Sequence, residues 1–172
     1  GNAAYNVPCT IRFEGAFDVP LMQRCIDDLV QRHESLRTRF VAVDGEPRCV
    51  IEPTAAVPVE HLDLSDQDDA ARREAALMEA LKRFSLRPFD LARAPLMRGL
   101  WVRLAPSEVF LCIVVDHIAA DGLSLAVFLA ELRELYGARH QHAEAGVAEV
   151  LWPLHLQYVD LATWQQRQFA AG

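Results

Sequence analysis

Residues 109–122 read Val-Phe-Leu-Cys-Ile-Val-Val-Asp-His-Ile-Ala-Ala-Asp-Gly, an apolar run that ends in charged and small residues. Residues 109–115 are apolar at every position, which predicts a strand buried on both faces in the middle of a covered sheet. The next helix is expected to begin at about Ser124. Two carboxylates and an imidazole therefore gather where a buried strand ends and a helix begins.

Strand-like and helix-like segments alternate on both sides of this stretch. Residues 9–14 alternate apolar and polar side chains, as in a half-buried strand, and residues 97–104 form a strand adjacent to 109–115. Asp44-Gly45 separates two short strand-like runs and predicts a hairpin turn. The alternation indicates an α+β domain. Its helices are expected after an Asp18 N-cap, from a Ser65 N-cap to Phe84, from Ser124 to a stop at Gly137, and over 154–169.

Length and composition set the class of protein. The 172 residues predict one domain, and 17 basic against 24 acidic residues give a net charge of −7. That balance argues against nucleic acid or an anionic membrane as partner, and no apolar run approaches the roughly 20 residues of a membrane-spanning helix. Cys9, Cys25, Cys49 and Cys112 show no Cys-x-x-Cys spacing, which favours reduced core thiols in a cytoplasmic protein. Without an initial Met or a signal peptide, the chain is expected to be a piece of something longer.

The residues around His117 suggest acid–base chemistry. A neutral imidazole at the end of a buried strand can take a proton from an amine or hydroxyl, and a helix N-terminus can favour a developing oxyanion. Gly122 removes the Cβ that would block close approach of a substrate. In the alternative interpretation, Asp121 is only a helix N-cap and His117 is a half-buried residue with satisfied hydrogen bonds.

A metal site is the other generic possibility. His117 and Asp121 stand four residues apart, as two ligands on one helical face would, and His140 and His142 are two apart on a polar stretch. Neither pair has a convincing third ligand in the sequence, so no metal is expected.

Several segments together resemble a known family. Asp-His-Ile-Ala-Ala-Asp-Gly at 116–122 resembles the HHxxxDG motif of condensation domains from nonribosomal peptide synthetases, which belong to the chloramphenicol acetyltransferase-like superfamily. Residues 32–40 resemble its RHExLRTxF segment, residues 88–98 its PFDLxxxPLxR segment, and residues 158–165 its YxDYAxWQ segment. Residues 2–8 are similar to the lead into the first strand of that family. The segments keep the family's order across nearly the whole chain.

The resemblance implies a fold and a reaction. Condensation domains consist of two similar lobes, with the active site in a tunnel between them. Residues 1–172 match only the N-terminal lobe: an α/β, two-layer chloramphenicol acetyltransferase-like lobe with a mixed sheet covered by helices. With the C-terminal lobe absent, the chain is expected to be inactive alone and to self-associate through the exposed lobe interface. The implied reaction is amide formation, and the implied partners are carrier proteins whose phosphopantetheine holds the substrates. The chain itself is expected to bind no cofactor.

The resemblance also implies roles for single residues. His117 matches the second His of the motif, which acts on the acceptor α-amine either as a base or by positioning it. Asp121 is expected to be structural and paired with a buried arginine, preferably Arg37, so that Asp121→Ala would orphan a buried charge. Gly122 lets the thioester arm pass, and Ser124 is assigned to substrate binding.

Asp116 departs from the family pattern, because it stands where the motif has its first His. Asp116, Asp121 and Ser124 also fit the DxxxxDxxS pattern of heterocyclisation domains, although those domains lack the second His, which is present here as His117. Asp116 can instead orient neighbouring backbone, pointing away from the tunnel. Amide condensation is favoured, with cyclisation or a non-catalytic relative that binds carrier proteins as alternatives.

Overall fold

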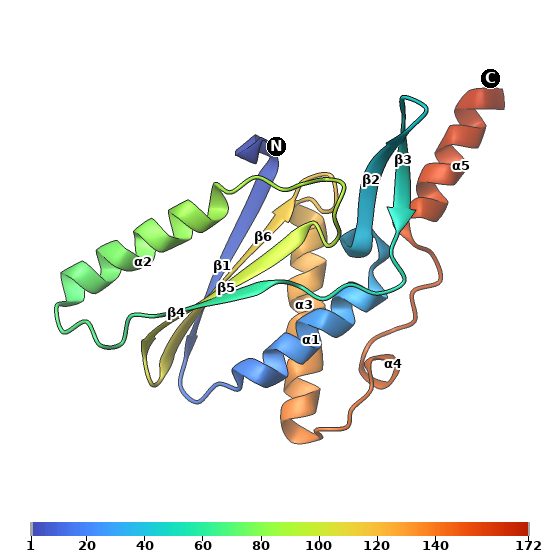
Figure 1. Ribbon diagram of the computed structural model, residues 1–172. Coiled ribbons are helices and arrows are strands. Elements are labelled where there is room, and N and C mark those ends of the chain that lie inside the picture. Colours follow the sequence, from blue (N-terminus) through green and yellow to red (C-terminus); the bar gives the residue numbers. More distant parts are fainter. Residues whose placement is uncertain (1, 172) are drawn as a thin grey trace.

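The computed structural model describes residues 2–171 and contains a four-stranded sheet, a separate hairpin and flanking helices (Figure 1). The sheet has the order β1 (Asn6–Glu14), β6 (Glu108–Asp116), β5 (Met97–Ala105) and β4 (Val59–Asp63). The first three strands pair antiparallel, whereas β4 runs parallel to β5. The predicted mixed sheet is confirmed.

The side chains of β6 alternate between two hydrophobic cores, one on each face of the sheet. Leu111, Ile113 and Val115 face one core, and Cys112 and Val114 face the other. All five are buried, as the uniformly apolar sequence predicts. A strand of this kind needs helices on both of its faces.

Three helices supply that cover. α1 (Val19–Arg32) and α3 (Gly122–Gln141) lie together on one face, and α2 (Ala70–Ser85) lies on the other. The lobe covered by helices is therefore confirmed, with one correction: it has three layers rather than two. The apolar character of both faces of β5 and β6 is the physical reason.

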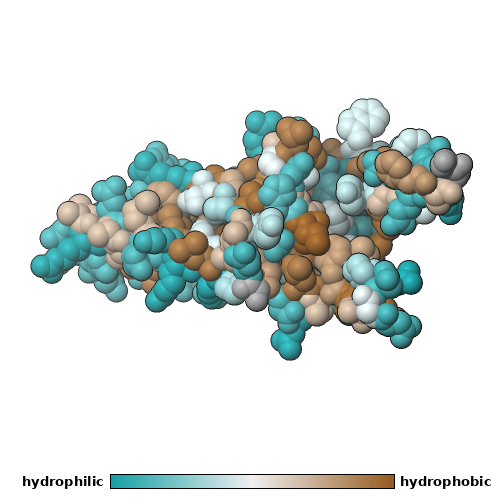
Figure 2. Space-filling view, turned by 90° about the horizontal axis from the view of Figure 1, so that it is seen from above, coloured by the Kyte–Doolittle hydropathy of each residue, from teal (hydrophilic) through white to brown (hydrophobic). Residues whose placement is uncertain are grey.

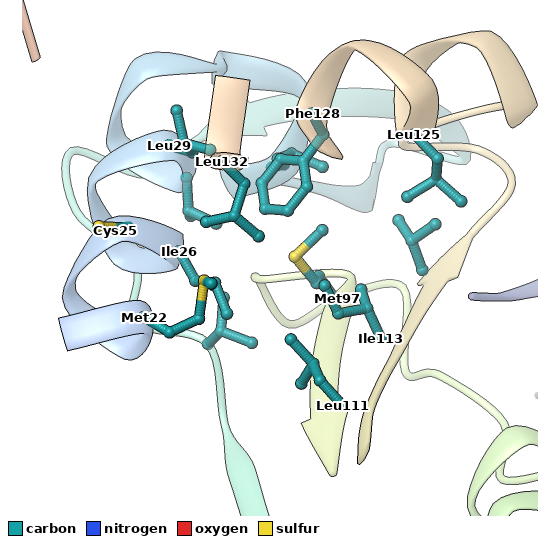
Figure 3. Close-up of a cluster of buried hydrophobic side chains, with 14 of the residues drawn as sticks. Met22, Cys25, Ile26, Leu29, Met97, Leu111, Ile113, Leu125, Phe128 and Leu132 are labelled. Atoms are coloured by element: carbon teal, nitrogen blue, oxygen red, sulfur yellow. The ribbon is translucent and has the colours of Figure 1, made fainter. Parts of the chain in front are cut away.

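The larger core lies between α1, α3 and the sheet (Figure 3). Leu29 of α1 and Phe128 and Leu132 of α3 point toward Met97 of β5 and the neighbouring β6 side chains. The side chain of Asp18 caps α1 by accepting the Leu21 N–H at 2.8 Å, as predicted.

The hairpin forms where the sequence predicts it. β2 (Thr38–Val43) and β3 (Glu46–Ile51) pair antiparallel around Asp44 and Gly45, whose φ angles are 52° and 81°. Two consecutive positive φ values are those of a type I′ turn, which Asp-Gly favours.

The ends of the other helices differ from the prediction. Asp69, not Ser65, caps α2, because the helix begins at Ala70 and the Asp69 carboxylate accepts the N–H groups of Ala71 and Arg72. The Ser65 hydroxyl donates to Asp63 at 2.6 Å instead. α3 continues through Gly137 to Gln141, and an ion pair of 2.6 Å between Arg139 and Asp28 joins its last turns to α1. Tertiary contacts thus override a glycine stop signal.

The remaining elements are short or lie in the last third of the chain. The last helix, α5, starts at Tyr158 rather than 154. The sequence pattern missed β4, which is an edge strand, and the short helices. The bounds not yet given are η1 (Ala3–Tyr5), η2 (Glu34–Arg37), α4 (Val147–Val150) and α5 (Tyr158–Ala171). Within residues 2–171, no helix is long and apolar enough to cross a bilayer.

All four cysteines are free thiols, as predicted. Cys25 and Cys112 are buried, and burial raises the pKa of both thiols above the ordinary value. Cys9 is half-buried, whereas Cys49 is exposed on β3 and so is not the core residue that was expected.

Leu132→Ala is expected to lower the free energy of unfolding by about 2–5 kcal/mol, because Leu132 is buried in the larger core and its truncation leaves a cavity. Leu123→Ala on the same helix is the matched control. Its side chain is 80% exposed, so the change is expected to stay within about 0.5 kcal/mol. Chemical denaturation followed by circular dichroism measures both, and equal losses would contradict this core.

Candidate active site

Backbone hydrogen bonds fix the chain where β6 ends. The Asp116 N–H donates to the Leu96 carbonyl and the His117 N–H to the Tyr5 carbonyl, each at 2.9 Å. The Ala119 N–H then turns back to the Asp116 carbonyl at 2.9 Å. The turn that carries His117 is therefore held by the residue before β5 on one side and by η1 on the other.

The carboxylate of Asp116 stabilises the same turn from inside. Asp116 is 6% exposed, and its Oδ1 accepts the Ile118 N–H at 3.0 Å. Asp116 thus orients neighbouring backbone, as expected. The backbone of His117 is consequently fixed on both sides, at Asp116 and at Ile118. Contrary to the expected orientation away from the reacting groups, Asp116 also lines the cavity of His117.

His117 itself is exposed and lines a cavity of about 600 Å³. The walls come from segments far apart in the sequence, namely η1 with its preceding residue, the loop before β5, and the end of β6. The lining residues are Asn2, Tyr5, Phe89, Leu91, Asp116, His117 and Ile118. Because most of this wall is apolar, the imidazole is the group there that offers a ring nitrogen to a polar substrate atom.

Asp121 caps α3 rather than completing a buried ion pair. Its Oδ1 accepts the Ser124 N–H at 2.8 Å and the Ser124 hydroxyl at 2.6 Å. The Ser124 hydroxyl holds the pKa of the Asp121 carboxyl below its ordinary value, with smaller contributions from the Ser124 N–H and from His117. The Leu125 N–H donates to the Asp121 carbonyl at 2.9 Å. The N–H groups of Ser124 and Leu125 are therefore both occupied and not available to an oxyanion.

The expected pairing of Arg37 with Asp121 is wrong. Arg37 lies in η2, and its guanidinium donates to the carbonyls of Gln31 and Glu52 and to the Glu34 carboxylate at 3.4 Å. Asp121 is exposed and already has Ser124 as its partner. Both residues belong to segments that resemble the family, but local partners satisfy each side chain here.

Gly122 and Ser124 lie at the start of α3. A Cβ built on Gly122 would meet no atom of the described chain within 4 Å, so the space beside it is open. Ser124 lines a second, smaller cavity of about 220 Å³ together with His33 and Ala120. Both residues therefore lie beside open space.

A third cavity adjoins the first at Ile118 and has a volume of about 230 Å³. It lies between the hairpin and α5, and its lining includes Phe40, Cys49 and Tyr158. The sequence pattern missed this cavity and the Tyr5 and Phe89 walls, because the chain brings them together only through tertiary contacts. Tyr5, Phe40, Phe89 and Tyr158 all stood in segments that resemble the family, and that resemblance was the available signal.

The described residues do not form a cluster suited to a metal. Within residues 2–171, no group of three or more His, Cys, Asp or Glu side chains is arranged to hold a metal ion. His140 is near the end of α3, far along the helix from Asp121 at its start.

Most of the exposed large apolar side chains lie in the last third of the chain. Figure 2 looks down on the end that carries the N-terminus and the hairpin, and hydrophobic residues are scattered between polar ones on this face. The expected stripe of α5, Tyr158, Leu161 and Phe169, is exposed. Other exposed apolar side chains are Ile118, Leu123, Val127, Trp152, Leu154, Leu156, Val159 and Trp164.

Comparisons with known proteins agree with the resemblance. The family described as "Condensation domain" matches residues 1–171. A component of the linear gramicidin synthase of Brevibacillus parabrevis is 40% identical over 162 residues, which are 94% of this chain and 2% of that protein. The chain therefore spans only a small part of this curated relative.

Solved structures share the fold. SgcC5 of Streptomyces globisporus superposes with a TM-score of 0.80 at 27% identity, covering 100% of this chain and 37% of that one. A chain from the complex of the X-domain and OxyB from teicoplanin biosynthesis superposes with a TM-score of 0.78 at 30% identity, covering 95% and 33% of the two chains.

Ser124→Ala is expected to raise the pKa of Asp121 toward its ordinary value, because the hydroxyl that stabilises the carboxylate is lost. A lowered pKa means that this stabilisation is present at neutral pH and is lost as the pH falls through the folded-state value. NMR titration of the carboxyl carbons measures the shift. Ser65→Ala is the control: it is expected to raise the pKa of Asp63 in the same way and to leave Asp121 unchanged.

Asp121→Ala is expected to lower the unfolding midpoint by about 2–4 °C, as the loss of an exposed helix cap does. Asp69→Ala, which removes the cap of α2, is expected to have a similar effect. Thermal unfolding followed by circular dichroism compares the two. A far larger drop in the unfolding midpoint for Asp121→Ala than for Asp69→Ala would contradict the capping role and favour the ion pair first expected between Asp121 and Arg37.

Proposed function

This chain belongs to the condensation-domain family, and we propose that it takes part in amide-bond formation in nonribosomal peptide synthesis, with His117 as the residue that contacts the reacting amine. One observation carries the proposal. The exposed imidazole of His117 lines a cavity of about 600 Å³ while hydrogen bonds fix its backbone on both sides. Such a group is pre-positioned for a substrate without being buried by this chain.

The chemistry needs one proton-accepting group. The acceptor amine attacks the carbonyl carbon of the donor thioester, so that a C–N bond forms and the C–S bond breaks. The attacking nitrogen loses a proton, and the leaving thiolate gains one. The His117 imidazole can take up the proton of the amine or hold the amine in line, and a positioned group of this kind is typically worth about 10²- to 10⁴-fold in rate.

The proposal assigns residues 1–172 to the N-terminal lobe of the domain. The chain matches 37% of the SgcC5 structure, and apolar side chains such as Trp152 and Phe169 are exposed. We assign this surface to the C-terminal lobe, and in the isolated chain to self-association. The substrates are the aminoacyl or peptidyl groups that carrier proteins present on phosphopantetheine. The chain alone is proposed to be inactive, because one wall of the tunnel comes from the other lobe.

Two alternatives remain for the same fold. Asp116, Asp121 and Ser124 fit the pattern of heterocyclisation domains, but the buried Asp116 carboxylate is bound to the Ile118 N–H, which favours condensation. The similarity to a chain from the complex of the X-domain and OxyB favours a protein-binding role as the second candidate. The presence of an exposed His117 in the motif favours the catalytic role over the protein-binding role.

His117→Ala in the intact condensation domain is expected to lower amide formation by about 10²- to 10⁴-fold, because the group that contacts the amine is removed. His140→Ala is the matched control, since His140 is an exposed histidine at the far end of α3. The measurement is release of dipeptidyl product from defined, loaded carrier proteins, followed by mass spectrometry.

Full product formation by the His117→Ala variant would remove the catalytic assignment. A cyclised product from the unaltered domain, with a Cys- or Ser-loaded acceptor, would replace condensation by cyclisation. Binding of carriers without any product would favour the protein-binding role.

A further inference from the structure

Arg98 of β5 is a buried cation without a carboxylate in contact. Its side chain is 8% exposed, and none of the ion pairs among residues 2–171 includes it. Its Nη2 donates to the carbonyls of Phe84, at 3.1 Å, and Arg87 at the end of α2. Its Nε has no hydrogen-bond partner in the described chain. Carbonyl dipoles satisfy part of the guanidinium, but its full charge is not neutralised by direct contact.

Asp116 is the opposite charge on the same face of the sheet. Across the two strands Arg98 faces Val114, and the Asp116 N–H bonds to Leu96, two residues before Arg98. Residues two apart on a strand point to the same face, so Arg98 and Asp116 are diagonal neighbours on adjacent strands. They are also the two charged residues that are nearly fully buried among residues 2–171.

Their surroundings are largely apolar. The Phe89 ring lies 4.0 Å from the guanidinium carbon of Arg98, and Phe89 and Asp116 both line the cavity of His117. Burial, together with the positive charge of Arg87, lowers the pKa of Arg98 to about 10, although Cys112, Glu60 and, to a smaller extent, Asp116 act in the opposite direction. Arg98 therefore remains charged at neutral pH, and its attraction to Asp116 is screened less than it would be at the surface.

We propose that Arg98 is a positioning residue for His117: its charge stabilises the buried Asp116 carboxylate, which holds the Ile118 N–H and with it the turn that carries the imidazole. Arg98 lies behind the Phe89 wall of the cavity and acts only through Asp116. The expected effect of Arg98 on amide formation rests on the proposed function. The electrostatic coupling between Arg98 and Asp116 is independent of that function and can be measured separately.

The test compares Arg98→Met, Asp116→Asn and the double variant in the intact condensation domain. Asn keeps an oxygen that can accept the Ile118 N–H, so the double variant lacks both charges but retains the hydrogen bond of the turn. Arg98→Met is expected to lower kcat for amide formation by about tenfold with little change in KM, because it removes the positive charge that stabilises the buried Asp116 carboxylate from the adjacent strand. The double variant is expected to recover kcat to within about threefold of the unaltered domain.

The rescue separates positioning from a purely structural role. Arg98→Met and the double variant both lose the bonds to the Phe84 and Arg87 carbonyls, so capping of α2 alone predicts equal defects in both. Equal or additive defects would overturn the proposal. Arg98→Lys keeps the charge and is expected to retain most of the activity, which also covers the case in which Arg98→Met does not fold.

The unfolding midpoints of the same proteins test the coupling without the reaction. If the unaltered domain forms no amide, the proposed function fails. The pairing of Arg98 with Asp116 then stands if the double variant unfolds at a higher temperature than Arg98→Met, and it falls if the double variant is the less stable of the two.

Discussion

Burial of both faces of β6 is the constraint on which the rest of this molecule depends. Because alternate side chains of the strand enter two separate cores, α1 with α3 must cover one face and α2 the other. The strand can end only where the polar groups of its backbone find hydrogen-bond partners, and it ends at Asp116. The Asp116 carboxylate accepts the Ile118 N–H, and the carbonyls of Leu96 and Tyr5 accept the N–H groups of Asp116 and His117. The backbone N–H groups at the start of the turn are therefore hydrogen-bonded. The position of His117 is thus a consequence of how the core ends.

The site combines a rigid backbone with an exposed side chain. The turn around His117 is held by Leu96, by η1 and by the Asp116 side chain, yet the ring faces a cavity bounded by distant segments. Ser124 donates to Asp121 at the start of α3, and Gly122 lies beside open space. This arrangement suits a substrate that enters from outside the chain, and the exposed apolar surface over α5 suits a further protein surface.

The sequence pattern predicted the local features of the fold correctly and several tertiary contacts wrongly. Local signals succeeded: the Asp18 cap, the Asp44-Gly45 turn and the burial of residues 109–115 all follow from neighbouring residues. Signals that compete with tertiary contacts failed. Gly137 did not end α3, and Arg37 found local carbonyls and Glu34 instead of Asp121. An ion pair between distant motifs cannot be read from spacing, because the nearest partner in space satisfies each charge.

The amino-acid sequence by itself determined that a buried strand ends at an Asp-His pair and that a helix follows, since both depend on hydrophobic pattern and capping chemistry. Only the tertiary structure decided what faces His117 and what stands behind Asp116. Strand register places Tyr5 next to His117 and Arg98 diagonal to Asp116, and the loop before β5 brings Phe89 to the cavity. The residues in each of these contacts are far apart along the chain, so no local pattern could reveal them.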